Sequence, residues 1–150
     1  MSNSAWVSKA LFKNKPWGRE VVASNHGNIS AKLITIEKGH STSFKYNNIK
    51  FETLVVLKGE IKVYYANSDF FSSNECSMKT EILEPGQALN VQCGCPYRLT
   101  AIETSQLLEI GDCTNNAELN TIRIIDDYGR TSEKVTAQEK EKIIKCIQDL

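Results

Sequence analysis

Short apolar or alternating segments, separated by turn residues, constrain the fold of this chain more than any other feature. The segments are "AKLITIEKG", "ETLVVLKGEIKVYY", "TEILEPGQALNV", "YRLTAIETSQLLEIGD" and "NTIRIIDDYGR". Such patterns are typical of β-strands that bury one face. We expect Lys58-Gly59 and Pro85-Gly86 to form turns, the first of them inside a hairpin. A series of strands without intervening helices predicts an all-β sandwich or barrel.

The C-terminal segment has a different pattern. In "VTAQEKEKIIKCIQDL", Thr136 and Glu139 have the spacing of a capping box. The apolar residues that follow at helical spacing are Ile143, Ile144, Ile147 and Leu150. We therefore expect a domain over residues 1–132, and an amphipathic helix within 133–150 that packs on the same domain or on a neighbouring subunit. The polar segment 67–79 is expected to be a long, mobile hairpin loop.

Composition and charge limit the partners of the chain. Its 150 residues are 41% apolar and 24% charged, which is typical of one globular domain. Lys plus Arg equals Asp plus Glu at 18 each, so no basic excess indicates a nucleic acid partner. No apolar run approaches the length of a transmembrane helix, and a membrane partner is not expected. A small-molecule ligand and a second copy of the chain, in a homodimer, are the expected partners.

The cysteines and the N-terminal segment predict a cellular location. The five cysteines are Cys76, Cys93, Cys95, Cys113 and Cys146. The start "MSNSAWVSKALFKNKPWG" lacks the apolar core of a secretory signal. We therefore expect a cytoplasmic protein with reduced thiols. Cys93-Gly94-Cys95 lacks the spacing of a C-x-x-C motif and is expected to lie at a tight turn.

Two groups of residues match the spacing of the paired cupin motifs, G-x5-H-x-H-x3/4-E-x6-G and G-x5-P-x-G-x2-H-x3-N. The matching positions are Gly39, Lys45, Asn47, Glu52, Gly59, Gly86, Gln92, Gly94, Tyr97 and Ala101. The chain therefore resembles the cupin superfamily. That resemblance implies a double-stranded β-helix, or jelly roll, with a site in the mouth of the barrel.

Three further stretches narrow the resemblance. "KPWGRE", "LEPGQALNVQCGCPYRL" and "IRIIDDYGR" are similar to the type II mannose-6-phosphate isomerase domain, over roughly residues 13 to 130. In that family a Gln or His, a His, a Glu and a last His hold a divalent metal, which polarises the sugar carbonyl. The resemblance implies that the chain binds, and as an enzyme isomerises, a phosphorylated sugar or nucleotide sugar.

The metal-ligand positions of that family hold different residues here. Lys45 and Asn47 replace the first two ligands, Glu52 keeps the carboxylate, and Tyr97 replaces the last histidine. An ammonium group has no lone pair to donate to a metal, so neither a metal nor another cofactor is predicted. Because a carboxylate facing an apolar interior needs a partner, our hypothesis places the Lys45 ammonium between Glu52 and the Tyr97 hydroxyl.

The role of this cluster has three interpretations. In the first, Lys45, Glu52 and Tyr97 are catalytic and shuttle protons, with a desolvated lysine of lowered pKa acting as the base. In the second, the cluster is the remnant of a metal site or part of a pocket that only binds. In the third, the protein is a metal-dependent enzyme that recruits an ion through Glu52 and other ligands.

Candidate substrate-binding residues are Arg130, Lys32 and Asn47. The resemblance implies that Arg130 contacts the anionic end of a substrate, and a guanidinium group suits a phosphate. The alternative for Arg130 is an ion pair with Asp126 or Asp127 that fixes the C-terminal segment. Lys32 becomes a second phosphate ligand if it points inward.

Overall fold

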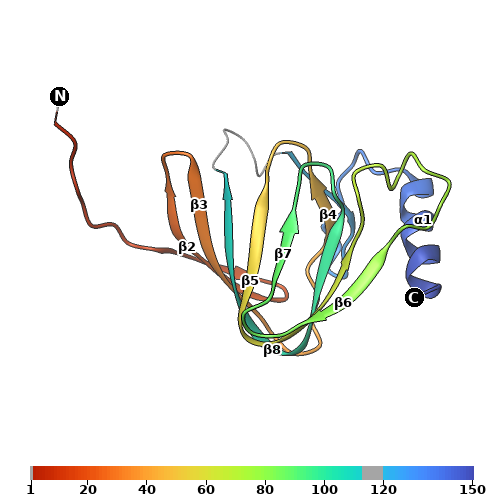
Figure 1. The fold of residues 1–150 in the computed structure, drawn as a ribbon, viewed down its shortest axis with the longest axis horizontal. Coiled ribbons are helices and arrows are strands. Elements are labelled where there is room, and N and C mark those ends of the chain that lie inside the picture. Colours follow the sequence, from red (N-terminus) through yellow and green to blue (C-terminus); the bar gives the residue numbers. More distant parts are fainter. Residues whose placement is uncertain (1, 113–119) are drawn as a thin grey trace.

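The computed structural model describes residues 2–112 and 120–150. In this part of the chain, strands precede a single helix (Figure 1). The elements are β1 (Leu11–Lys15), β2 (Gly18–His26), β3 (Ile29–Ile36), β4 (Phe44–Asn47), β5 (Glu52–Tyr65), β6 (Lys79–Leu83), β7 (Ala88–Val91), β8 (Tyr97–Asp112), β9 (Thr121–Ile125) and α1 (Ala137–Gln148). The strand pairs are antiparallel, as expected for an all-β chain.

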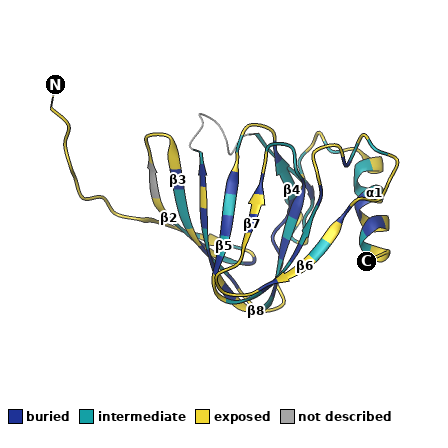
Figure 2. Ribbon diagram, in the orientation of Figure 1, coloured by how far each residue is buried: buried dark blue, intermediate teal, exposed yellow. Residues whose placement is uncertain are grey.

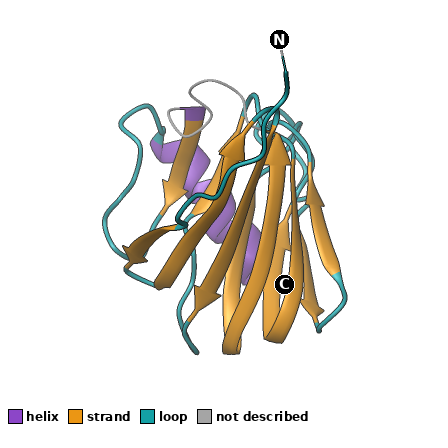
Figure 3. Cartoon of the chain, turned by 90° about the vertical axis from the view of Figure 1, so that its left-hand side faces the viewer, coloured by secondary structure: helices purple, strands orange, loops and turns teal. Residues whose placement is uncertain are grey.

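Two long strands, β5 and β8, connect the two layers of the barrel. They pair with each other from Glu52 and Gly111 at one end to Tyr65 and Tyr97 at the other. The first half of β5 also pairs with β7, and the second half of β8 pairs with β3, which continues to β2 and β1. The second half of β5 pairs with β6. The first half of β8 pairs with β4, which in turn pairs with β9. The sheet therefore curls into two facing layers (Figures 1 and 3).

The expected hairpin turn at Lys58-Gly59 is not formed, because both residues lie inside β5. The β5–β8 pairing is irregular around them, and β5 bends there from one layer into the other. A Cβ atom on Gly59 would lie 2.2 Å from the Ser105 hydroxyl and 2.7 Å from the Thr104 carbonyl oxygen, and its φ is +93°. The glycine therefore permits close contact between two bent strands.

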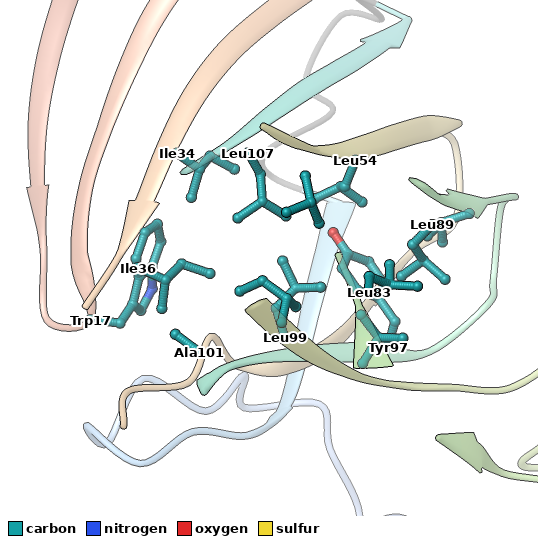
Figure 4. Packing of buried hydrophobic residues seen from close by; sticks show 14 residues of the cluster. Trp17, Ile34, Ile36, Leu54, Leu83, Leu89, Tyr97, Leu99, Ala101 and Leu107 are labelled. Atoms are coloured by element: carbon teal, nitrogen blue, oxygen red, sulfur yellow. The ribbon is translucent and has the colours of Figure 1, made fainter. Parts of the chain in front are cut away.

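The main hydrophobic core fills the space between the two layers. Inward-facing residues alternate with exposed ones along the strands, as Figure 2 shows. Trp17 stands at one end of the packed group and Tyr97 with Leu89 at the other (Figure 4). Trp17 is only 6% exposed, so the "KPWG" segment anchors the N-terminal strands in this core. Pro85-Gly86 forms the expected turn between β6 and β7.

A second hydrophobic cluster lies beneath α1. It joins α1 to β4, β9 and the segment before β6, and its fully buried members are Phe44, Phe70, Ile124 and Ile143. The predicted capping box is present, since Thr136 and Glu139 cap each other's backbone N–H groups. The expected apolar face is partly wrong: Ile144 and Leu150 are about half exposed, whereas Cys146 is buried.

The segment 67–78 is fixed to α1 by several contacts, which corrects the expectation of a mobile loop. Phe70 is fully buried, and the Lys142 ammonium donates to the carbonyl oxygens of Phe70 and Ser73. A Cys76–Cys146 disulfide links the same segment to the helix. This disulfide contradicts the expectation that all thiols are reduced.

The remaining cysteine predictions have mixed outcomes. Cys93 and Cys95 are free thiols beside a turn at Gly94, as expected from their spacing. Cys113 lies outside the described residues. Within residues 2–112 and 120–150, no helix is long and apolar enough to span a bilayer. The homodimer stays a prediction.

Candidate functional site

A cavity of about 290 Å³ opens between the two layers. Polar residues from seven strands and the neighbouring loops line it. All six residues singled out in the sequence lie on its wall: Lys32, Asn47, Lys45, Glu52, Tyr97 and Arg130. The wall also contains Lys15, Glu20, Lys50, Glu109 and Arg123, which the sequence analysis did not select.

Strand register explains why several of these side chains face one another. Lys45 on β4 is paired with Tyr97 on β8 and with Arg123 on β9. Residues in register across a sheet project from the same face, so these three side chains form one row across the cavity wall. Asn47 and Thr121 form the next pair on the same face, and the Asn47 amide donates a 3.1 Å hydrogen bond to the Thr121 hydroxyl.

Glu52 is held by Tyr97 and Lys50. The Tyr97 hydroxyl donates a 2.6 Å hydrogen bond to Glu52 Oε1. The Lys50 Nζ atom lies 3.2 Å from Glu52 Oε2 and 2.8 Å from Glu109 Oε1, and all four side chains are almost completely buried. The ammonium group beside Glu52 therefore comes from Lys50 and not from Lys45, and Tyr97 bonds Glu52 directly instead of through an ammonium group.

Lys45 occupies a different position from the one that we predicted. Its Nζ atom lies 5.7 Å from the centre of the Tyr97 ring. No ion pair within 4.0 Å joins it to the part of the chain that the structure describes, whereas Lys50, two residues before β5 begins, contacts Glu52 at 3.2 Å. Lys45 still acts on Glu52 electrostatically over a longer distance.

The charges in this cluster reinforce one another. Burial alone would raise the pKa of Glu52, but Lys45, Lys50 and the Tyr97 hydrogen bond outweigh burial and lower it. Burial alone would lower the pKa of Lys50, but Glu109 and Glu52 raise it. Burial and the two carboxylates raise the pKa of Tyr97 well above 10. At neutral pH the cluster therefore holds a carboxylate, an ammonium and a neutral phenol.

Glu20 forms a second charged group on the adjoining strands β2 and β3, where its partner Lys32 is paired in register with Glu109 on β8. Its carboxylate lies 2.7 Å from Lys32 Nζ and 3.2 Å from Lys15 Nζ. Burial opposes its ionisation, yet the two lysines lower its pKa to about 2. Lys32 points into the cavity beside Ile34, which is the orientation that its candidate role requires.

Arg130 forms the ion pair considered as the alternative to substrate contact. Its Nη2 and Nε atoms lie 2.9 Å and 3.2 Å from the two carboxylate oxygens of Asp126. The Asp126 side chain is completely buried and also accepts a 2.7 Å hydrogen bond from Ser43. Despite burial, Arg130 and Ser43 lower the pKa of Asp126 far below its usual range. Arg130 therefore fixes the "DDYGR" turn while its exposed edge reaches the cavity.

One of the cavity residues that the sequence analysis did not select could have been found from strand alternation. Glu109 follows Leu107 by two residues in "SQLLEIGD", so strand alternation places it on the buried face. Arg123 lacks this signal, because it alternates with Ile122 and Ile124, which form the apolar face of the strand. Lys50 carries no such signal, because it lies in the connection between β4 and β5. Its side-chain direction depends on how that connection folds.

Solved structures, but not sequences, resemble this chain. No protein-family model matches the sequence, and no curated protein matches it significantly. KdgF from Halomonas sp. is 12% identical, with a TM-score of 0.59 over 73% of this chain and 97% of that chain. A putative sugar phosphate isomerase from Acidithiobacillus ferrooxidans is 20% identical, with a TM-score of 0.52 over 70% of this chain and 68% of the other.

A third structure carries the name of the superfamily. It is a sugar phosphate isomerase from a cupin superfamily of Silicibacter pomeroyi, 12% identical, with a TM-score of 0.53. The match covers 64% of this chain and 59% of that one. The chain has the cupin fold. The predicted jelly roll with a C-terminal helix is thus confirmed.

The residues in the cavity do not suit the metal implied by the resemblance to mannose-6-phosphate isomerases. Lys45 and Asn47 stand at the first two ligand positions, and Glu52 is already bonded to Lys50 and Tyr97. Within residues 2–112 and 120–150, no three His, Cys, Asp or Glu side chains are arranged to hold a metal ion. Ammonium and neutral phenol groups are poor metal ligands.

Proposed function

We propose that the cavity binds a phosphorylated monosaccharide. The observation that carries this proposal is the charge of its wall, where six lysine or arginine side chains accompany three glutamates. A concave site with excess positive charge attracts anions, and its low-dielectric walls strengthen that attraction. Hydroxyl and amide groups from Thr42, Ser43, Asn47 and Thr121 also line the wall and suit the hydroxyl groups of a sugar.

The size of the cavity favours a monosaccharide over a nucleotide sugar. Ligand pockets range from about 300 to 1,000 Å³, and this cavity of about 290 Å³ is at the lower limit. A sugar phosphate fills such a volume, whereas a nucleotide sugar has roughly twice as many groups to bury. Two structures with the same fold carry names of sugar phosphate isomerases, which supports this class of ligand.

Binding is favoured over proton transfer by the ionisation of the central cluster. An efficient general acid or base has a pKa near the working pH. The pKa of Glu52 is lowered, and the pKa values of Lys50 and Tyr97 are raised, so all three move away from neutrality. Isomerisation is the second candidate, because the Tyr97–Glu52 hydrogen bond faces the cavity where a sugar carbonyl would lie.

Calorimetric titration with mannose 6-phosphate, mannose and inorganic phosphate tests the proposal. We expect mannose 6-phosphate to bind at least about tenfold more tightly than mannose, because charge-assisted contacts add to the sugar contacts. Equal affinity for the two sugars, or binding of neither, would contradict it. A coupled assay for fructose 6-phosphate, with and without chelator, then separates a binding protein from an isomerase.

A further inference from the structure

Some of the charged side chains around the cavity form ion pairs with one another, and others do not. Lys15 and Lys32 share Glu20, while Glu52 and Glu109 share Lys50. These three lysines and three glutamates balance in charge. Arg130 is balanced separately by Asp126. The two remaining cations on the wall, Lys45 and Arg123, are left without an ion pair within 4.0 Å in the described ranges, although Lys45 also acts on Glu52 at longer range.

Lys45 and Arg123 lie directly opposite each other on adjacent strands. They are paired in the β4–β9 register, and both side chains are half-buried. Neither forms an ion pair within 4.0 Å with any residue in the described ranges, although the Arg123 backbone N–H is fixed by the Ser132 hydroxyl. Like charges in direct cross-strand pairs destabilise a sheet. This arrangement is therefore unfavourable until an anion lies between the two side chains.

We propose that Lys45 and Arg123 form the subsite that holds the phosphate group of the ligand. This inference rests on the proposed function and identifies the ligand as a phosphomonoester. A phosphomonoester carries a charge of about −1.5 to −2 at pH 7, which matches two cations. The guanidinium group offers paired donors to two phosphate oxygens, and the ammonium group adds a compact charge.

The subsite also defines the orientation of the sugar. Lys45 has Arg123 on one side of its row and Tyr97 on the other. A phosphate held between the two cations directs the attached sugar across Tyr97 toward Glu52 and Lys50. The phosphate thus lies at the β4–β9 wall, and Arg130, which the family resemblance suggested, acts mainly on Asp126.

Three single variants test this assignment: Lys45→Met, Arg123→Met and the control Lys79→Met. Lys79 is an exposed cation on β6 that does not line the cavity. Each protein is titrated calorimetrically with mannose 6-phosphate and with inorganic phosphate. We expect the two cavity variants to weaken the binding of both probes by at least about tenfold, and the control to leave it within about twofold.

Thermal melting of the ligand-free proteins provides an independent measurement. Because Arg123→Met removes one charge of a like-charge pair, we expect its melting temperature to equal or exceed that of the wild type. Lys45→Met also removes a charge that stabilises the Glu52 carboxylate, so its melting temperature should lie below that of Arg123→Met. Unchanged affinity for mannose 6-phosphate in both variants would overturn the subsite and leave the proposed function standing. Binding of inorganic phosphate that depends on both residues, without binding of the sugar phosphate, would support the subsite and contradict the proposed function. Wild-type protein that binds neither probe would overturn both.

Discussion

The Lys50 ammonium lies 2.8 Å from a carboxylate oxygen of Glu109, inside the mouth of the barrel. It also contacts Glu52, which in turn accepts the Tyr97 hydroxyl. The carboxylate that the cupin spacing places at position 52 is thus stabilised by a side-chain cation. The cluster occupies the region where the family resemblance implies a metal.

Replacing Lys50 by methionine leaves two buried carboxylates without their partner. We expect the free energy of unfolding to fall by about 3–5 kcal/mol, as is typical when one member of a buried ion pair is removed. Urea denaturation measures this change. Lys79→Met is the control, because Lys79 is an exposed cation on β6 that does not line the cavity, and its free energy of unfolding should change by less than about 1 kcal/mol. A Lys50→Met protein as stable as the wild type would contradict the role given to Lys50.

The stability of the protein should decrease in acid partly because of Glu20. Its pKa is about 2 in the folded protein and 4.5 ordinarily, so its stabilising contribution is complete above about pH 5. That contribution is lost as the pH falls from about 5 to 2, and it is on the order of 3 kcal/mol. Urea denaturation between pH 3 and 7 should show a shallower pH dependence in Glu20→Gln. An unchanged slope would contradict the assignment.

Asp126 and Asp127 are adjacent carboxylates with different surroundings. Asp126 is fully buried against Arg130 and Ser43, whereas Asp127 is half exposed beside Arg98. Asp126→Asn should lower the free energy of unfolding by roughly 2–4 kcal/mol, and Asp127→Asn by less than about 1 kcal/mol. Denaturant melts of the two variants provide the comparison. Equal losses would show that the buried ion pair does not fix this turn.

Tyr97 should be the tyrosine that resists ionisation. Burial and two nearby carboxylates raise its pKa, so it stays protonated when exposed tyrosines lose their protons. Ultraviolet titration of the wild type and Tyr97→Phe to pH 10.5 should give the same phenolate absorbance. A smaller absorbance change in the variant would mean that Tyr97 ionises in this range, and proton transfer by Tyr97 would regain support.

The sequence predicts the strands well because alternation and turn chemistry are local. The capping box at Thr136 and the turn at Pro85-Gly86 appear as expected. The interpretation of Lys58-Gly59 was wrong for a reason that lies in tertiary structure. The same glycine that permits a hairpin turn also permits close contact with Ser105 on β8, and a single sequence does not distinguish these cases.

The wall of the cavity could be predicted, but not its ion pairs. Cupin spacing identified Lys45, Glu52 and Tyr97 as neighbours, because strand register fixes where their backbones lie. The choice between Lys45 and Lys50 as the partner of Glu52 depends on a connecting loop and on two flexible side chains. Local patterns do not determine such a choice, and only the folded chain brings Glu109 to Lys50.

A crystal structure of the protein grown with mannose 6-phosphate tests the central claim most directly. We expect density for the ester in the cavity, with its phosphate between Lys45 and Arg123 and its sugar over Tyr97. Density for the phosphate outside the cavity, or a metal ion bound to Glu52 in place of Lys50, would contradict it.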